Sequence, residues 1–187
     1  MKPYSMISIT LCSLLLLTLP LHLAGAQVTA PETCKAAIKV VSNIDYKFCV
    51  STLNENRTFV FLDANDTRVF ANISATAATT HAHNVITSIQ DSLRKSPEPV
   101  TKSVLMHCTG SYNNVASSWG KAVIAINEKN DDVAKISLRE GMTSVISCET
   151  QFGTAGKLSP LTGMNVVSAE LVTLTYAILE VAEKNKY

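Results

Sequence analysis

The placement of cysteines on a helical sequence pattern constrains this chain more than any other feature. Between residues 105 and 126, apolar residues recur after alternating steps of three and four, the spacing of one buried helix face. Cys108 lies on this stripe, and Cys148 lies on a later stripe of the same period. The midpoint of the two cysteines is residue 128, inside the polar stretch INEKNDD. Because residues equidistant from the turn of an antiparallel helical hairpin face each other, the pattern predicts a turn here and a Cys108–Cys148 disulfide.

Four stripes of this kind follow one another and predict four long helices. The breaks SPEP, NEKNDD and GTAGKLSP separate them, and proline cannot continue a helix interior. No long segment alternates with the period of a strand. Because the connections are short, the predicted fold is all-α, an up-down-up-down four-helix bundle. The stripes are Ala71, Ala75, Ala78, Ala82, Val85, Ile89 and Leu93; Leu105, Cys108, Tyr112, Val115, Trp119, Ala122 and Ile126; Ala134, Leu138, Gly141, Val145, Cys148 and Phe152; and Met164, Val167, Leu171, Leu174, Ile178 and Val181.

The remaining cysteines predict a smaller helical hairpin ahead of the bundle. The midpoint of Cys34 and Cys49 lies beside the turn-like stretch SNID. A bridge from Cys49 to Cys108 would instead be centred on Ala78, inside an uninterrupted helical stripe. The symmetry therefore predicts a Cys34–Cys49 disulfide that closes an N-terminal helical hairpin, and two disulfides in all.

The N-terminal residues have the character of a secretion signal. Lys2 precedes a long apolar run, and the small residues AGA follow it. A membrane anchor is the weaker interpretation, because the run is barely long enough to span a bilayer and contains Pro20 and His22. We expect a mature chain without a membrane segment. The predicted organisation is a signal peptide at 1–26 and a single domain at 27–187, divided into a hairpin with its linker at 27–64 and a four-helix bundle at 65–187.

The mature chain has balanced charge and three glycosylation sequons. The whole chain has 16 basic and 15 acidic side chains, and only Lys2 is lost with the signal. The chain therefore lacks the excess of basic residues that would indicate a nucleic-acid partner. Sequons begin at Asn56, Asn65 and Asn72. In a secreted chain they predict at least one glycan and a solvent-exposed face.

We find no residue constellation for catalysis, a cofactor or a metal. His81 and His83 form the sequence HAH, but residues two apart on a helix point about 200° away from each other. The stretch GTAGKLS has two residues between its glycines, where a phosphate-binding loop has four. Trp119 is expected in the core, with Gly120 permitting a close helix contact or a bend. The chain is therefore predicted not to be an enzyme, and such a bundle works by presenting a surface to another protein.

Several stretches together resemble the plant invertase and pectin methylesterase inhibitor family. They are TCKAAIKVVSNIDYKFCVSTL, VLMHCTGSYNNVASSW, MTSVISCETQF and LVTLTYAILEVA, in the order typical of that family. The N-terminal half is similar to the branch that contains plane-tree pollen allergens described as invertase inhibitors. The resemblance covers nearly all of the mature chain.

The resemblance implies a function without catalysis or cofactor. Family members reversibly inhibit pectin methylesterase or acid invertase in a 1:1 complex, lying across the substrate cleft of the enzyme in the cell wall, in the apoplast, or in the vacuole. Some invertase inhibitors carry Pro-Lys-Phe at the start of the third bundle helix. Asp131, Asp132 and Val133 occupy the matching positions and are the expected partner contacts, although a carboxylate replaces the cation. The alternatives are a receptor-binding helical ligand, an allergen-like protein without inhibitory activity and a small-molecule carrier.

Overall fold

The computed structural model describes residues 28–55, 65–95 and 97–184, and within them the chain is entirely helical. The predicted signal peptide and the sequon at Asn56 lie outside the described residues. The helices are α1 (Ala30–Val40), α2 (Tyr46–Glu55), α3 (Arg68–Arg94), α4 (Pro99–Asn127), α5 (Asp131–Thr154) and α6 (Thr162–Lys184).

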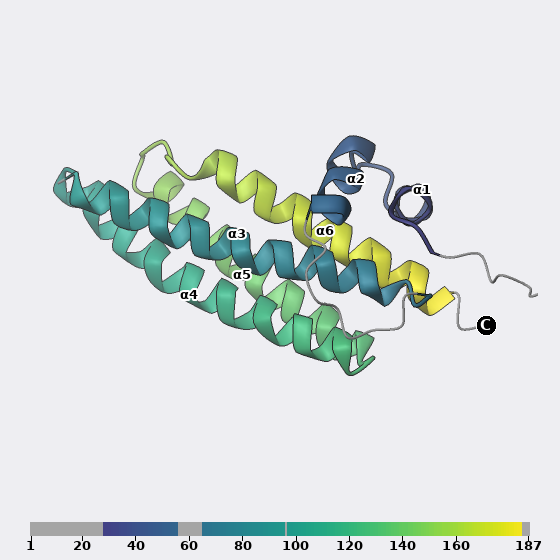
Figure 1. Cartoon of the computed structure of the whole chain (residues 1–187). Helices are drawn as coiled ribbons and strands as arrows, with labels where there is room; N and C mark the ends of the chain where they lie inside the picture. Colours follow the sequence, from purple (N-terminus) through teal and green to yellow (C-terminus); the bar gives the residue numbers. More distant parts are fainter. Residues whose placement is uncertain (1–27, 56–64, 96, 185–187) are drawn as a thin grey trace, which may run out of the picture.

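The four long helices form the predicted antiparallel bundle. Around the bundle, α3 packs against α4 and α6, and α5 packs against the same two helices (Figure 1). Each helix runs opposite to the one before it, so the up-down-up-down fold class is confirmed. The α1–α2 hairpin lies on the outside of the bundle, where α1 packs against α6 and α2 contacts α3 (Figure 1).

Both predicted disulfides are present. Cys34 joins Cys49 across the α1–α2 hairpin, with a Cα–Cα distance of 5.9 Å. Cys108 of α4 joins Cys148 of α5, with a Cα–Cα distance of 4.8 Å. All four cysteines are fully buried. The symmetry of the cysteines about the polar turns therefore gave the correct pairing.

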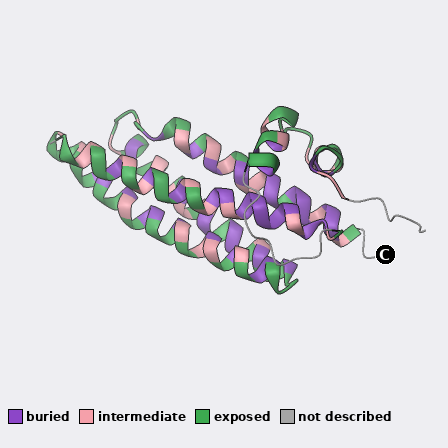
Figure 2. Ribbon diagram, in the orientation of Figure 1, coloured by how far each residue is buried: buried purple, intermediate pink, exposed green. Residues whose placement is uncertain are grey.

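The apolar stripes of α3, α4 and α5 face the core as predicted (Figure 2). All of their members are buried except Leu93, which is half-buried near the end of α3. The prediction for the start of α6 is confirmed only in part. Met164 and Val167 pack against the core but are half-buried, whereas the polar residues Asn165 and Ser168 are buried. These two polar side chains point inward because both meet Tyr112. The buried hydroxyl of Tyr112 donates a hydrogen bond to Oδ1 of Asn165 and lies 3.4 Å from Oγ of Ser168.

Trp119 fills the centre of the α4–α5 contact. Its ring is fully buried, and Nε1 donates a hydrogen bond to the carbonyl oxygen of Leu138 at 3.2 Å. A Cβ atom added at Gly141 would lie 2.2 Å from Nε1 of Trp119, so α5 makes room for the indole with a glycine. The expected close contact at Gly120 is absent, because a Cβ atom there would meet no atom within 4 Å.

Among the described helices, α6 alone is long and apolar enough to cross a membrane by length and composition. Half of its most apolar window is buried inside the bundle. A central helix of a bundle has this composition because it buries much of its circumference.

Candidate partner-binding site

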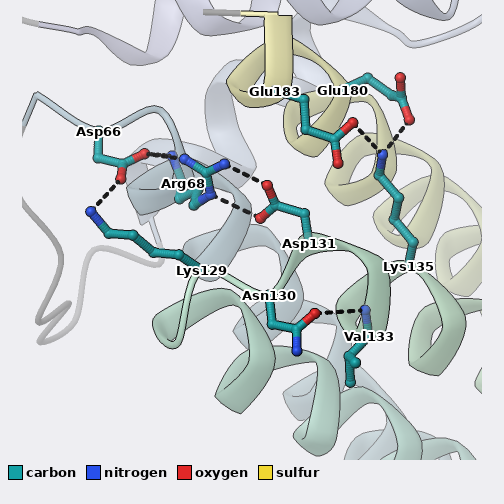
Figure 3. Close-up of polar contacts among 9 residues, drawn as sticks. All are labelled: Asp66, Arg68, Lys129, Asn130, Asp131, Val133, Lys135, Glu180 and Glu183. Atoms are coloured by element: carbon teal, nitrogen blue, oxygen red, sulfur yellow. Dashed lines mark hydrogen bonds and ion pairs between the residues drawn. The ribbon is translucent and has the colours of Figure 1, made fainter. Parts of the chain in front are cut away.

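The turn between α4 and α5 and the first residues of α5 form the end of the bundle where partner contacts were expected. The turn comprises residues 128–130, so it includes the predicted midpoint. Lys129 has a φ of 58°, which is uncommon for a residue with a side chain. The Asn130 side chain then accepts a hydrogen bond from the backbone N–H of Val133 and caps α5 (Figure 3). The turn therefore has a defined conformation.

The start of α5 combines a buried charge with exposed aliphatic side chains. Asp131 is 5% exposed, whereas Val133 is 44% and Ile136 is 47% exposed. At these positions the helix departs from the usual amphipathic arrangement, although Ala134 and Leu138 still face the core. Asp132 is also exposed. We call Asp132, Val133 and Ile136 the outer patch.

Arg68, the first residue of α3, pairs with Asp131 in the interior. Nε of Arg68 donates to Oδ1 of Asp131 at 2.8 Å, and Nη2 donates to Oδ2 (Figure 3). The hydrogen bond that Arg68 donates to Asp131 raises the pKa of Arg68 and outweighs the opposing effect of burial. Removing one partner would leave a buried charge without compensation, which is strongly destabilising. The pair therefore ties the start of α3 to the start of α5.

Asp66 extends this contact to the turn itself. Its Oδ1 accepts hydrogen bonds from the backbone N–H and from Nη1 of Arg68, and its Oδ2 lies 3.3 Å from Nζ of Lys129 (Figure 3). Burial opposes ionisation of Asp66. The Arg68 N–H and the charges of Arg68 and Lys129 together outweigh it, so the pKa of Asp66 is lowered. The carboxylate therefore links α3 to the residue with positive φ.

Lys135, one turn into α5, is held by α6. Its Nζ donates hydrogen bonds to Glu180 and Glu183 (Figure 3). The same atom lies 5.3 Å from the ring centroid of Tyr176. Burial lowers the pKa of Lys135, but the two carboxylates outweigh it and the pKa is raised. By the helical period, Glu180 and Glu183 lie on the polar side of α6, where a solvated position is the ordinary expectation. They are instead half-buried, because they face a lysine on the neighbouring helix.

The predicted partner contacts therefore divide into two groups. Asp132 and Val133 are exposed and available. The prediction for Asp131 is wrong, because its carboxylate is buried against Arg68 and cannot meet a partner. The sequence did contain a signal for this, because steps of three back from Ala71 and Ala134 reach Arg68 and Asp131. Ile136 was missed because an isolated exposed aliphatic residue has no sequence signature.

A polar groove lies further along the same two helices. Nε2 of His107 on α4 is 3.2 Å from Oγ of Ser147 on α5. Small and hydroxyl-bearing residues surround this histidine. The lining residues are His107, Gly110, Ser111, Asn114, Thr143, Ser144 and Ser147.

The other candidate residues on α3 occupy different environments. Asn65, just before α3, is exposed. Asn72 is buried and its Nδ2 donates to Oδ1 of Asn127 at 2.8 Å, so the expectation that its sequon is exposed is wrong. Nε2 of His81 lies 2.9 Å from the carbonyl oxygen of Met164, whereas His83 is exposed. Within the described part of the chain, no group of three or more His, Cys, Asp or Glu side chains is arranged to hold a metal.

The sequence model of the plant invertase/pectin methylesterase inhibitor family matches residues 29–178. The chain belongs to this family. It is a family of inhibitors rather than enzymes, which confirms the prediction of a non-catalytic protein. The predicted resemblance to the plane-tree branch is also confirmed by the relatives that follow.

The similar proteins are inhibitors from three plants. A protein from Platanus acerifolia named "Putative invertase inhibitor" is 28% identical over 147 residues, covering 78% of this chain and 80% of its own. A protein of the same name from Platanus orientalis is 27% identical over 147 residues, which cover 78% of this chain and 85% of the Platanus orientalis protein. Pectinesterase inhibitor 8 of Oryza sativa subsp. japonica is 26% identical over 157 residues, covering 83% and 84%.

A solved structure supports the fold. A crystal structure of a pectin methylesterase inhibitor from Arabidopsis thaliana aligns with a TM-score of 0.58 and 12% identity, covering 82% of this chain and 97% of that chain. A mutant form of an Arabidopsis pectin methylesterase inhibitor aligns with a TM-score of 0.61 and 13% identity, covering 79% and 92%. The family bundle is therefore preserved at low sequence identity.

Proposed function

We propose that this protein is secreted to the apoplast and inhibits pectin methylesterase or acid invertase. It forms a 1:1 complex in which the outer side of α4 and α5 covers the substrate cleft of the enzyme. The exposure of two aliphatic side chains at the start of α5 is the observation that carries the proposal. Val133 and Ile136 are exposed while the charge of Asp131 is paired inside with Arg68, so these aliphatic side chains are accessible to another protein.

The surface around the outer patch has the features of a protein interface. Ile124, which is 58% exposed on α4, lies just before the turn that leads to Val133. The hydroxyl-lined groove at His107 lies further along the same two helices. A small apolar centre with polar surroundings is typical of specific interfaces. The Cys108–Cys148 bridge fixes α4 against α5, which reduces the conformational entropy lost on binding.

Single substitutions in the outer patch test the proposal. The mature protein is titrated against purified pectin methylesterase and acid invertase at about pH 5, with residual activity and complex formation on size exclusion as the measurements. We expect Val133→Asp and Ile136→Asp to raise the inhibition constant by about tenfold or more, because each places a charge in a desolvated contact.

The matched control is Val166→Asp, which changes a valine on α6 that is 53% exposed, against 44% for Val133. It should leave inhibition unchanged. If the mature protein leaves both enzymes fully active and forms no complex, the proposed function is wrong. If Val166→Asp weakens inhibition and the outer-patch variants do not, the contact surface is wrong.

A further inference from the structure

The start of α3 contacts the chain before, within and after the α4–α5 turn. Asn72 binds Asn127, the last residue of α4. Asp66 binds Lys129 in the turn, and Arg68 binds Asp131, the first residue of α5. The turn that precedes the outer patch is therefore held by polar groups of one neighbouring segment, residues 66–72.

From this arrangement we propose that Arg68 is a positioning residue for partner binding and acts through Asp131. The proposal rests on the proposed function, because it concerns the same surface. The guanidinium donates two hydrogen bonds to the two carboxylate oxygens, through Nε and Nη2. Such a paired contact fixes orientation as well as distance.

The position of Asp131 makes its orientation important. Asp132 and Val133 follow it directly, and Ile136 is little more than one helical turn further on. Rotation of the first turn of α5 about its axis would move all three side chains of the outer patch. Lys135 restrains the same helix from the α6 side through Glu180 and Glu183. Arg68 is thus the restraint that acts at the first residue of the helix.

This role can be separated from a contribution to stability. An apolar pair of similar volume often replaces a buried ion pair without loss of stability, because the charges no longer need to be desolvated. An apolar pair, however, makes no directional hydrogen bonds. The double variant Arg68→Met/Asp131→Leu therefore keeps the interior filled and removes the directional contact between the two residues. It also removes the Nη1 hydrogen bond to Asp66, which keeps the backbone N–H of residue 68 and Nζ of Lys129 as partners. Arg68→Lys keeps the charge and loses the two-point contact.

The experiment combines hydrogen exchange with binding kinetics on the mature, disulfide-bonded protein. In the double variant we expect a melting temperature close to that of the wild type, exchange about tenfold faster or more at the amides of residues 128–133, and dissociation from the target enzyme about tenfold faster. Arg68→Lys should show a smaller change in both rates. Equal exchange at residues 128–133 in the double variant and the wild type would overturn the positioning role.

Tyr112→Phe is the matched structural control, because it removes a buried hydrogen bond of α4 far from the turn. It should lower the melting temperature and leave both exchange at residues 128–133 and the dissociation rate unchanged. If the wild type binds neither enzyme, the proposed function fails, but the exchange measurement still decides whether Arg68 orders the turn. If a stable double variant exchanges faster and dissociates at the wild-type rate, Arg68 orders the turn without positioning the partner-binding surface, and the proposal is wrong.

Discussion

Gly141 shows how one missing side chain decides the contact between α4 and α5. A Cβ atom at this position would lie 2.2 Å from Nε1 of Trp119, so the indole fills the space that a side chain would need. We expect Gly141→Ala to lower the free energy of unfolding by about 1–3 kcal/mol, the usual effect of overpacking a core. The hydrogen bond from Trp119 to Leu138 would also be displaced. Urea unfolding followed by Trp119 fluorescence measures the loss.

Gly120→Ala is the control for this prediction, since the site has open space beyond its Cα. Alanine favours a helix over glycine by about 1 kcal/mol, so this variant should be as stable as the wild type or more stable. If both variants are equally destabilised, the effect is not specific to the contact between Gly141 and Trp119.

Asn72 makes a second prediction at the scale of one residue. Its side-chain nitrogen, the atom to which a glycan would be attached, donates to Asn127 between α3 and α4. A glycan there would break this bond and would not fit at a buried position. We expect the folded secreted protein to carry no glycan at Asn72, whereas Asn65 lies at an exposed position. Peptide mass mapping before and after enzymatic deglycosylation reads both sites, and an occupied Asn72 in the folded protein would contradict the burial.

At the scale of one element, α4 begins with a charged cap. The carboxylate of Glu98 accepts hydrogen bonds from the hydroxyl and N–H of Thr101 and the N–H of Val100, and it pairs with Lys157. The Thr101 side chain first, and then these other contacts, lower the pKa of Glu98 from 4.5 to about 2. Because the folded-state pKa is the lower one, the cap stabilises the protein fully above about pH 4.5 and less as the pH falls toward 2.

The prediction is tested with Glu98→Ala by comparing melting temperatures from pH 2 to pH 7. The difference between wild type and variant should be constant above about pH 5 and shrink steadily below it. Other titrating groups are common to both proteins and cancel in the difference. A difference that does not change between pH 5 and pH 2 would show that the ionised carboxylate is not what caps α4.

The same scale shows what sequence patterns can and cannot predict. The period of apolar residues predicted the core faces of α3, α4 and α5, because burial of one helix face requires that spacing. A stripe counted from apolar residues alone leaves out charged ones, so Arg68 and Asp131 were not recognised as buried although both continue the inward stripes. Lys135, which lies off the stripe, was not recognised as half-buried. At the start of α6 the apolar period is outweighed by hydrogen bonding, since Asn165 and Ser168 turn inward to meet Tyr112. Such pairs depend on residues distant in the chain.

At the scale of the whole molecule, one disulfide lies within the four-helix bundle and the other lies in the hairpin outside it. Cys108–Cys148 joins two central helices of the bundle across a sequence separation of 40. Cys34–Cys49 closes a hairpin that lies outside the bundle, across a separation of 15. Chain entropy in the unfolded state gives stabilisations of about 4 and about 3 kcal/mol for loops of these lengths. By this measure alone the two bridges are nearly equivalent.

Their positions in the fold predict different consequences. Replacing Cys108 and Cys148 by alanine should lower the global free energy of unfolding by about 4 kcal/mol as seen by Trp119 fluorescence, because Trp119 packs in the same α4–α5 contact. Replacing Cys34 and Cys49 should instead accelerate hydrogen exchange mainly in α1 and α2, which rest on α6 and α3 from outside. The Trp119 transition should then move much less. If both double variants shift that transition equally, the hairpin unfolds together with the bundle and the molecule is a single cooperative unit.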